Sequence, residues 1–401
     1  MLRRKFNIEK SRKVFIKHNT DFVLDNFLEA EMKPALLPLY VAQWLSLAPK
    51  YSLRYDLVTS NGHKFNAFVC LCSVAISASW FYIVLNFLLK AVRMYAITIF
   101  AYSITLVVGV ILNSIITVSH SNMNAYLIIL LQRIFKRFVF VNIDIKNITK
   151  VNWIFLIIMA VYNIALFTTR LLESSSTFVS KFLIHFIYIS IDCNSIIAIR
   201  TIHLLGKLMD TWISELKTFS YANCADTEAN NYMNKIIVGY DELIQALNIC
   251  DKVFRVPVFF TVLSCFFQVF VNVQAAISVS NIGYHDPRIL AFLLFKVPVW
   301  TRSMYVAQFI WVKNITLLAL LSKESESIHL KVKNAQVASV VVCARGTTAE
   351  TSRLVRRQGQ RAGDGRWLRA AGLFPVDAAL PPSFLAVLAT YTVVLLQFQF
   401  L

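Results

Sequence analysis

Long apolar runs recur along the chain and are separated by shorter polar stretches. A helix that crosses a membrane needs about 20 mostly apolar residues. The runs that meet this requirement cover about residues 67–90, 96–118, 151–170, 182–204, 256–279, 290–313 and 383–401. The pattern therefore predicts an all-α membrane protein with seven transmembrane helices.

A further apolar run, from Pro34 to Tyr51, is broken by Pro38 and Pro49 and is barely long enough to cross. Proline removes a helical hydrogen bond and restricts the residues before it. We therefore expect a short re-entrant or interfacial segment here rather than a full crossing.

Lysine and arginine set the orientation, because cytoplasmic connections carry an excess of both. If the amino terminus is cytoplasmic, most of these residues fall in the inside segments, which are 1–66, 119–150, 205–255 and 314–382. The outside connections, 91–95, 171–181 and 280–289, then hold only Arg93, Lys181 and Arg288. The distribution predicts a cytoplasmic amino terminus and an external carboxyl terminus.

The inside segment 205–255 has its own periodicity. Its apolar residues recur at intervals of three and four, which is typical of amphipathic helices; examples are Trp212, Leu216, Ile236, Tyr240, Leu243 and Leu247. Such helices would continue the fourth and fifth spans as long cytoplasmic extensions. They either pack only against each other or help to form a base between subunits, and the pattern is compatible with both.

Composition narrows the function classes. The chain is 57% hydrophobic and only 15% charged, which is unusual for a soluble domain. Its net charge of +18 does not indicate nucleic-acid binding, because the basic residues lie between the apolar runs rather than on one soluble face. The seven cysteines form no CxxC pair, and we interpret them as structural thiols.

The sequence shows no nucleophile elbow, phosphate-binding glycine loop or metal-ligand spacing. We therefore expect no enzyme activity, no catalytic residue, no metal and no cofactor.

Charged residues inside the spans are informative, because each costs about 2.5–3.5 kcal/mol at a helix centre on insertion scales. Asp192 in the fourth span is expected to pair with Lys296 or Arg302 of the sixth span. Arg200 lies near the inner end of its span, from which its side chain can reach the interface. A structural ion pair is favoured here over a ligand contact.

The outer halves of the spans combine aromatic faces with hydrogen-bonding groups, as in a small-ligand pocket. The candidate pocket residues are Tyr102, Tyr162, His185, Tyr188, Gln268, Asn272 and Trp300, together with Asn163, Thr168 and Gln274. Ordinary contacts between helices and interface aromatics would give a similar pattern.

In the last span, Thr390, Val394, Gln397, Phe398 and Leu401 fall on one helical face at 100° per residue. This face suits a narrow pore with a hydrophobic constriction and one polar ring. A glutamine that bonds a neighbouring helix explains the same pattern.

Thr390-Tyr391, five intervening residues and Gln397-Phe398 resemble the carboxyl-terminal signature of insect gustatory receptors. Gly372 to Asp377 is similar to the stretch that precedes the last span in that family, and Leu47-Ala48-Pro49 is similar to its lead-in near the amino terminus. The resemblance is residue-specific only in these three places.

The resemblance implies a ligand-gated, non-selective cation channel in the plasma membrane, in dendrites of gustatory sensory neurons. It implies four identical subunits, or a heteromer with related receptors, around a pore lined by 383–401. The gate residues would be Thr390, Tyr391, Val394, Gln397 and Phe398. The implied partners are a small-molecule tastant and the lipid bilayer.

The predicted organisation has four parts. A cytoplasmic region with the re-entrant helix covers 1–66, and the first six spans with their cytoplasmic helices cover 67–335. An atypical cytoplasmic loop covers 336–382, and the pore-lining helix covers 383–401. From Ala335 onward the chain has no isoleucine, asparagine or lysine. Our hypothesis is that this part comes from an exon of a related receptor gene joined wrongly to this one; a full-length transcript across the junction would refute it.

Other functions remain open at this stage. An odorant receptor would share the architecture, although the signature of the last span favours taste. A secondary transporter would show internal repeats and helices broken at mid-membrane. We find no repeat, and an odd number of spans disfavours two equal halves. A G-protein-coupled receptor would have the opposite orientation.

Overall fold

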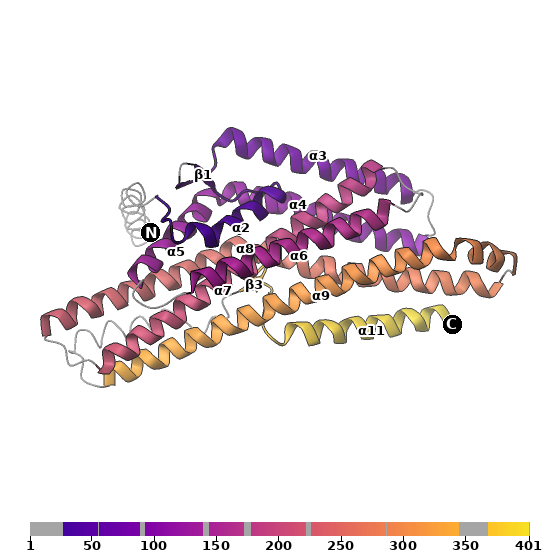
Figure 1. Ribbon diagram of the computed structural model, residues 1–401. Helices are drawn as coiled ribbons and strands as arrows, with labels where there is room; N and C mark the ends of the chain where they lie inside the picture. The colour runs from indigo at the N-terminus through magenta and orange to yellow at the C-terminus, as the bar shows by residue number, and fades with distance from the viewer. Residues whose placement is uncertain are drawn as a thin grey trace, which may run out of the picture.

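Helices make up most of the fold in the computed structural model (Figure 1). The structure describes residues 27–54, 56–88, 93–138, 144–171, 178–221, 226–285, 287–344 and 368–400. The long helices are α3 (His63–Leu88), α4 (Arg93–Ser119), α6 (Ile145–Leu171), α7 (Phe178–Tyr221), α8 (Asp226–His285), α9 (Pro287–Ala344) and α11 (Leu380–Phe400).

Five helices in the described part of the chain have segments long and apolar enough to cross a membrane, at His63–Asn86, Ile97–Ser119, Ile145–Leu171, Phe178–Thr218 and Tyr232–Gln274. These segments contain most of each of the first five predicted spans. The sixth predicted span, 290–313, falls within α9, where side chains up to residue 307 lie outside the described ones. Residues 383–400 of the last predicted span fall within α11, whose described apolar part is the shorter stretch Leu380–Val394.

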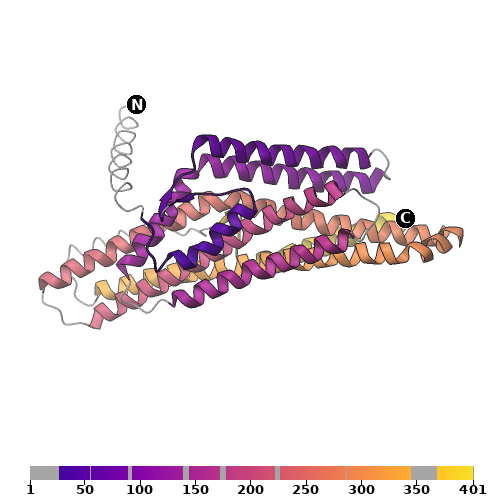
Figure 2. The ribbon, with the colours of Figure 1, turned by 45° about the horizontal axis from the view of Figure 1, so that its top comes forward.

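Three helices are much longer than a bilayer requires. α7, α8 and α9 contain 44, 60 and 58 residues. At 1.5 Å per residue they are about 65–90 Å long, against about 30 Å for the hydrocarbon core. In Figure 1 they extend together beyond the other helices, at the end opposite the carboxyl terminus, and Figure 2 shows α3 and α4 side by side above them. The predicted helical continuation of the fourth and fifth spans is confirmed.

The apolar stripe of these extensions is the core of the fold. Trp212 of α7 stacks on Tyr240 of α8 with ring centroids 4.8 Å apart, and its indole nitrogen donates a hydrogen bond to the carbonyl of Ile236 at 2.9 Å. Leu321 and Ala335 of α9 are buried in the same cluster. α9 therefore continues unbroken through position 335.

The segment 119–150 was predicted as a connection, but it contains the helix α5 (Ser121–Arg137). The middle of α5, Leu127 to Gln132, is buried, and the helix packs mainly on α8. Arg137 forms a bidentate ion pair with Glu242 of α8, at 3.0 and 3.2 Å. Gly239 allows the close approach of Phe138, since a Cβ at this glycine would overlap the phenylalanine ring.

The amino-terminal apolar run forms the helix α2 (Lys33–Leu45), which packs on α6 and α7. Its 13 residues give a length of about 20 Å, so it is too short to cross a bilayer. Beyond α2, Leu47 adopts a left-handed backbone with φ of 46° and reverses the chain. A short antiparallel hairpin follows, formed by β1 (Ser52–Arg54) and β2 (Leu57–Thr59).

A second antiparallel hairpin consists of β3 (Arg369–Ala370) and β4 (Phe374–Pro375). These two hairpins are a small correction to the all-α prediction. Their strands are two or three residues long and depend on tertiary contacts, so the sequence pattern gives no sign of them.

Lys50, in the turn after α2, is buried although it is cationic. Its side chain is packed above the ring of Phe254 of α8, with the ammonium 5.3 Å from the ring centroid. The residue is only 3% exposed, and its ammonium has no hydrogen-bond partner among the described residues. Burial lowers the pKa of Lys50 from 10.5 to about 8. The folded state therefore disfavours the charged form.

We predict that Lys50→Met raises the thermal stability of the purified protein at pH 7, by about 1–3 kcal/mol. The unfolded chain binds the proton more tightly than the folded one, so the penalty is complete below about pH 8 and disappears as pH rises toward 10.5. Thermal melts of both proteins between pH 7 and 10 should show the difference shrinking with pH. A constant difference, or a less stable variant, would contradict this account.

Candidate functional site

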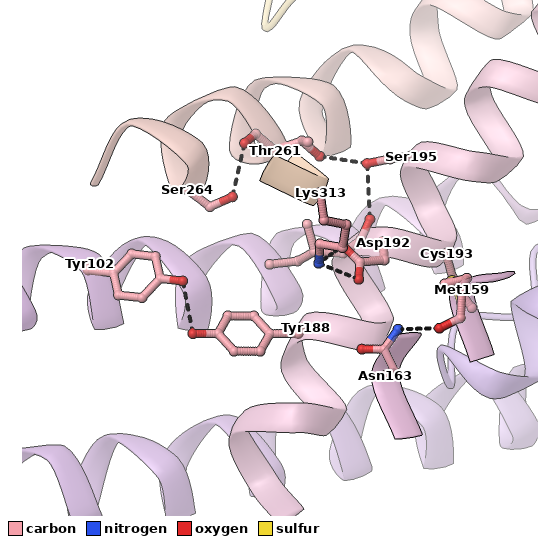
Figure 3. Close-up of polar contacts among 11 residues, drawn as sticks. Tyr102, Met159, Asn163, Tyr188, Asp192, Cys193, Ser195, Thr261, Ser264 and Lys313 are labelled. Atoms are coloured by element: carbon pink, nitrogen blue, oxygen red, sulfur yellow. Dashed lines mark hydrogen bonds and ion pairs between the residues drawn. The ribbon is translucent and has the colours of Figure 1, made fainter. Parts of the chain in front are cut away.

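Four of the predicted pocket residues converge between α4, α6 and α7. The hydroxyl of Tyr102 in α4 donates a hydrogen bond to the hydroxyl of Tyr188 in α7 at 3.0 Å (Figure 3). His185 lies one turn before Tyr188, and its ring is edge-on to that tyrosine with centroids 6.4 Å apart. Tyr162 of α6 shares a cationic neighbour, Lys313, with Tyr188. We call Tyr102, Tyr162, His185 and Tyr188 the tyrosine cluster.

An ion pair lies beside this cluster. Both carboxylate oxygens of Asp192 in α7 accept hydrogen bonds from the ammonium of Lys313 in α9, at 2.6 and 2.7 Å (Figure 3). The two side chains are 4% and 13% exposed. The Lys313 ammonium also lies 5.6 Å from the ring centroid of Tyr162 and 5.9 Å from that of Tyr188. This cation therefore connects α9 to α6 and α7.

The predicted pairing of Asp192 with a cation of the sixth span is confirmed, and this cation is Lys313. The side chains of the predicted partners, Lys296 and Arg302, lie outside the described residues. Lys313 ends the apolar run 290–313, so from sequence it marked a boundary rather than an interior charge. In the structure it lies opposite Asp192, because α7 and α9 pack along their length.

Arg170 is a second cation beside the tyrosine cluster, and it was not among the predicted site residues. It ends the third predicted span, and its guanidinium lies 5.6 Å from the ring centroid of Tyr188. The sequence feature that could have identified Arg170 is its position, since it is a cation at the end of an apolar run that contains a predicted pocket aromatic. Together with Lys313 it gives the cluster two cations facing aromatic rings.

Several buried polar atoms near the cluster have no hydrogen-bond partner among the described residues. They include Tyr162 Oη and His185 Nε2, as well as the indole nitrogens of Trp80 and Trp311. Buried polar groups are normally paired, so unpaired ones at a polar and aromatic site are available to a ligand or to water. His185 Nδ1 is already used, since it lies 3.2 Å from the carbonyl of Lys181.

The remaining predicted pocket residues, Gln268, Asn272 and Trp300, do not belong to the tyrosine cluster. Gln268 donates to Asn272 along α8 at 3.3 Å, while Phe267 and Val271 of the same stretch pack against the hydrophobic cluster that contains Tyr102 and Tyr188. The side chain of Trp300 lies outside the described residues.

The three additional candidates each have a local explanation. Asn163 donates to the carbonyl of Met159 in its own helix (Figure 3), and Gln274 is hydrogen-bonded to Thr98. Thr168 is exposed and donates to Ile164 in its own helix.

α11 packs on α8 and α9 through one face only. Phe384 and Leu388 are buried with Val262, Cys265 and Leu318. Among the predicted gate residues, Thr390, Val394 and Gln397 are exposed in the isolated chain.

Tyr391 is half exposed and lies against Phe266 and Phe270 of α8, with ring centroids 6.1 and 5.7 Å apart. The side chain of Phe398 lies outside the described residues.

The hairpin β3–β4 determines where α11 begins. Its backbone docks on α8: the amide of Arg369 donates to Asp251 at 3.2 Å, and the amide of Ala371 donates to the carbonyl of Arg255 at 2.9 Å. The tight turn uses left-handed backbone at Ala371 and Gly372, with φ of 48° and 78°. The side chain of Asp377 then accepts a hydrogen bond from the amide of Ala379 at 3.2 Å, in the turn immediately before α11. The stretch from Gly372 to Asp377 therefore lies between the point where the hairpin docks on α8 and the beginning of α11.

We predict that Asp192→Asn lowers the stability of the detergent-solubilised protein by about 3–5 kcal/mol, because it leaves the Lys313 cation buried without its partner. Lys313→Met should cost a similar amount. The double variant Asp192→Leu, Lys313→Met should recover most of the loss, as replacement of a whole buried pair by apolar residues usually does. Size-exclusion profiles after graded heating measure this. Additive losses in the double variant would show that the pair does not exist.

The fold has counterparts among solved structures. The chain is similar to the insect olfactory receptor OR5 from Machilis hrabei, with a TM-score of 0.63 and 11% identity, over 90% of this chain and 97% of that one. It is also similar to the same receptor in complex with eugenol, with a TM-score of 0.59 and 12% identity over the same shares. No protein-family model and no curated protein matches the chain. The chain therefore has the fold of an insect olfactory receptor, as the resemblance to insect chemoreceptors predicted.

Proposed function

We propose that this chain is an insect-type gustatory receptor, a ligand-gated, non-selective cation channel that small tastants open in the plasma membrane of sensory neurons. The observation that carries the proposal is the signature of α11, Thr390-Tyr391 and Gln397-Phe398, on a helix with exposed polar residues in a chain with an insect chemoreceptor fold. Neither a cofactor nor covalent chemistry is needed, since cations pass down their own gradient.

The exposed face of α11 supports a pore between copies of the chain. The side-chain amide of Gln397 would be costly against lipid, where polar groups lack partners. The hydroxyl of Thr390 on the same face already donates to the carbonyl of Ala386 in its own helix, at 3.0 Å. A ring of α11 helices from four subunits, either identical or related, would place these groups on an aqueous path. Val394 would lie between them as an apolar constriction, which suits gating by dewetting. Gln397 and Phe398 would form the gate.

The tyrosine cluster is the proposed ligand site. Its aromatic faces, two nearby cations and unpaired Tyr162 and His185 atoms suit a small, partly apolar molecule with one or two hydrogen-bonding groups. Gln268, Asn272 and Trp300 would complete the lining from α8 and α9.

Two helices connect this site to the pore helix. α9 carries Lys313 beside the tyrosine cluster, and five residues later Leu318 is buried against α11. Phe267 of α8 packs against the hydrophobic cluster that contains Tyr102 and Tyr188, while the adjacent Phe266 lies against Tyr391. A shift of either helix on ligand binding would therefore move contacts of α11. In this mechanism the ligand stabilises the arrangement of α8 and α9 in which the pore is open.

An odorant receptor is the second candidate, because the similar solved structures are of an olfactory receptor, one of them in complex with eugenol. The two candidates differ in ligand rather than in mechanism. A panel of sugars and bitter compounds beside a panel of volatile aromatics separates them. No structural observation favours a transporter or a G-protein-coupled receptor.

We predict that cells expressing this chain show a tastant-evoked cation current that needs no G protein. Tyr102→Phe removes the hydrogen bond to Tyr188, and His185→Ala removes an unpaired polar group, so each should raise the half-maximal ligand concentration about tenfold. Gln397→Ala should instead change ion permeation. Whole-cell recording measures both.

Thr168→Val is the matched control, because this exposed residue bonds only within its own helix. It should leave the ligand response unchanged. Absence of current, with surface expression confirmed and both ligand panels applied, would contradict the proposed function for the chain acting alone.

A further inference from the structure

A cavity of about 260 Å³ opens at the end of the bundle where α6 begins, far along α7 from the tyrosine cluster. Asp144 and Asn147 line it from the start of α6, and Arg200, His203, Lys207 and Asp210 line it from α7. The four α7 residues recur at intervals of three and four, so they occupy one helical face. The cavity thus gathers charged groups from two helices.

Two of these groups already have partners on α9. Asp210 forms a 2.6 Å ion pair with Lys331, and His203 Nδ1 lies 3.1 Å from Glu324. The carboxylate of Glu324 also interacts electrostatically with Arg200. Two cations of the lining, Arg200 and Lys207, therefore face the cavity from α7, and the carboxylate of Asp144 faces it from α6.

Arg200 is buried but incompletely paired. Its Nε donates to Asn152 at 2.5 Å and its guanidinium lies 5.3 Å from the ring centroid of Phe155. Among the described residues it makes no second hydrogen bond. A guanidinium has five N–H donors, so four remain for a ligand or water.

Lys207 is exposed and has neither an ion pair nor a hydrogen bond from its ammonium in the described part of the chain. The two cations are seven residues apart, or about 10 Å along α7. The two side chains could therefore bind one anion between them, each from a different turn of α7.

The position of the cavity suits a lipid headgroup. The apolar run 182–204 of α7 ends between Arg200 and Lys207, which is where a bilayer passes from acyl chains to headgroups. The next turns of α6 present exposed apolar side chains, including Ile154, Ile157 and Ile158. Acyl chains can lie on this surface while the headgroup enters the cavity. The volume is below the usual 300–1,000 Å³ of a whole small-molecule site.

We propose that this cavity binds the phosphodiester headgroup of a membrane phospholipid. Arg200 and Lys207 donate to the phosphate oxygens, and Asp144 accepts from an ammonium further along the headgroup, as in phosphatidylethanolamine. The two free oxygens of a phosphodiester can each accept a hydrogen bond from one of these two cations. The lipid would hold the start of α6 against α7. This inference requires membrane insertion but not channel activity.

The test is a lipid titration of the purified, delipidated full-length chain, followed by native mass spectrometry. The probe is phosphatidylethanolamine, and the main variant is Lys207→Gln, which should fold normally because the side chain is exposed and unpaired. It should weaken binding of the tightest lipid about tenfold, the usual loss for a hydrogen bond to a charged group. Lys217→Gln, an exposed lysine outside the cavity on the same helix, should change it less than about twofold. An equal loss of lipid binding in the two variants would contradict the proposed site.

Two further arms identify the headgroup and its source. Phosphatidylcholine lacks an N–H donor and should bind more weakly than phosphatidylethanolamine, and Asp144→Asn should remove that preference. Equal binding of both lipids to the unmodified chain would overturn the role of Asp144. Glycerophosphoethanolamine has the same headgroup without acyl chains and should compete only at concentrations about a hundredfold higher. Equal affinity for this soluble compound would overturn the assignment to a membrane lipid.

Discussion

α7, α8 and α9 pack against one another over most of their length, and the other elements are positioned by this contact. A helix inside a bilayer satisfies its own backbone hydrogen bonds, so its side chains decide what it packs on. Beyond the bilayer the same helices need an apolar stripe, which Trp212, Tyr240 and Leu321 supply. α2, α5 and the hairpin β3–β4 dock on these helices. A displacement of one long helix against another is therefore transmitted to several sites.

This arrangement explains how the proposed ligand site and the proposed pore can be coupled without touching. The hydrophobic cluster that contains Tyr102 and Tyr188 also includes Ile310 of α9, and Phe267 of α8 packs against it. α11 contacts the same two helices at the neighbouring residues Phe266 and Leu318. The buried pair of Asp192 and Lys313 holds α7 to α9 at the level of the cluster. Because a buried ion pair has a narrow range of good geometries, it favours discrete arrangements of these helices over continuous sliding.

Much of the fold could be predicted because it rests on hydropathy and helical periodicity. The first five spans and the helical extensions of α7 and α8 follow from apolar runs and from the spacing of residues such as Trp212 and Leu216. α5 was missed because its apolar run, Ala125 to Leu131, is much shorter than the roughly 20 residues that a search for spans requires. The hairpins were missed because their short strands are fixed by contacts with distant residues, such as Arg255.

The candidate site was predictable in part for a similar reason. Aromatic and polar residues in the outer halves of the spans identified Tyr102 and Tyr188, but the sequence could not pair them. It also gave a cation of α9 as the partner of Asp192 without identifying Lys313, since the register of two packed helices depends on side-chain packing along both.

The central claim is that α11 lines a cation pore. It can be tested by cysteine substitution at Val394 and Gln397, with a cationic thiol reagent applied during ligand-evoked current. Leu388→Cys serves as the control, because Leu388 is buried on the face of α11 that packs on α8 and α9. The account predicts that the reagent suppresses current in the Val394 and Gln397 variants, and that it leaves the unmodified chain and the Leu388 variant unaffected. Suppression at Leu388 alone, or at none of the three positions, would show that α11 does not line the conduction path.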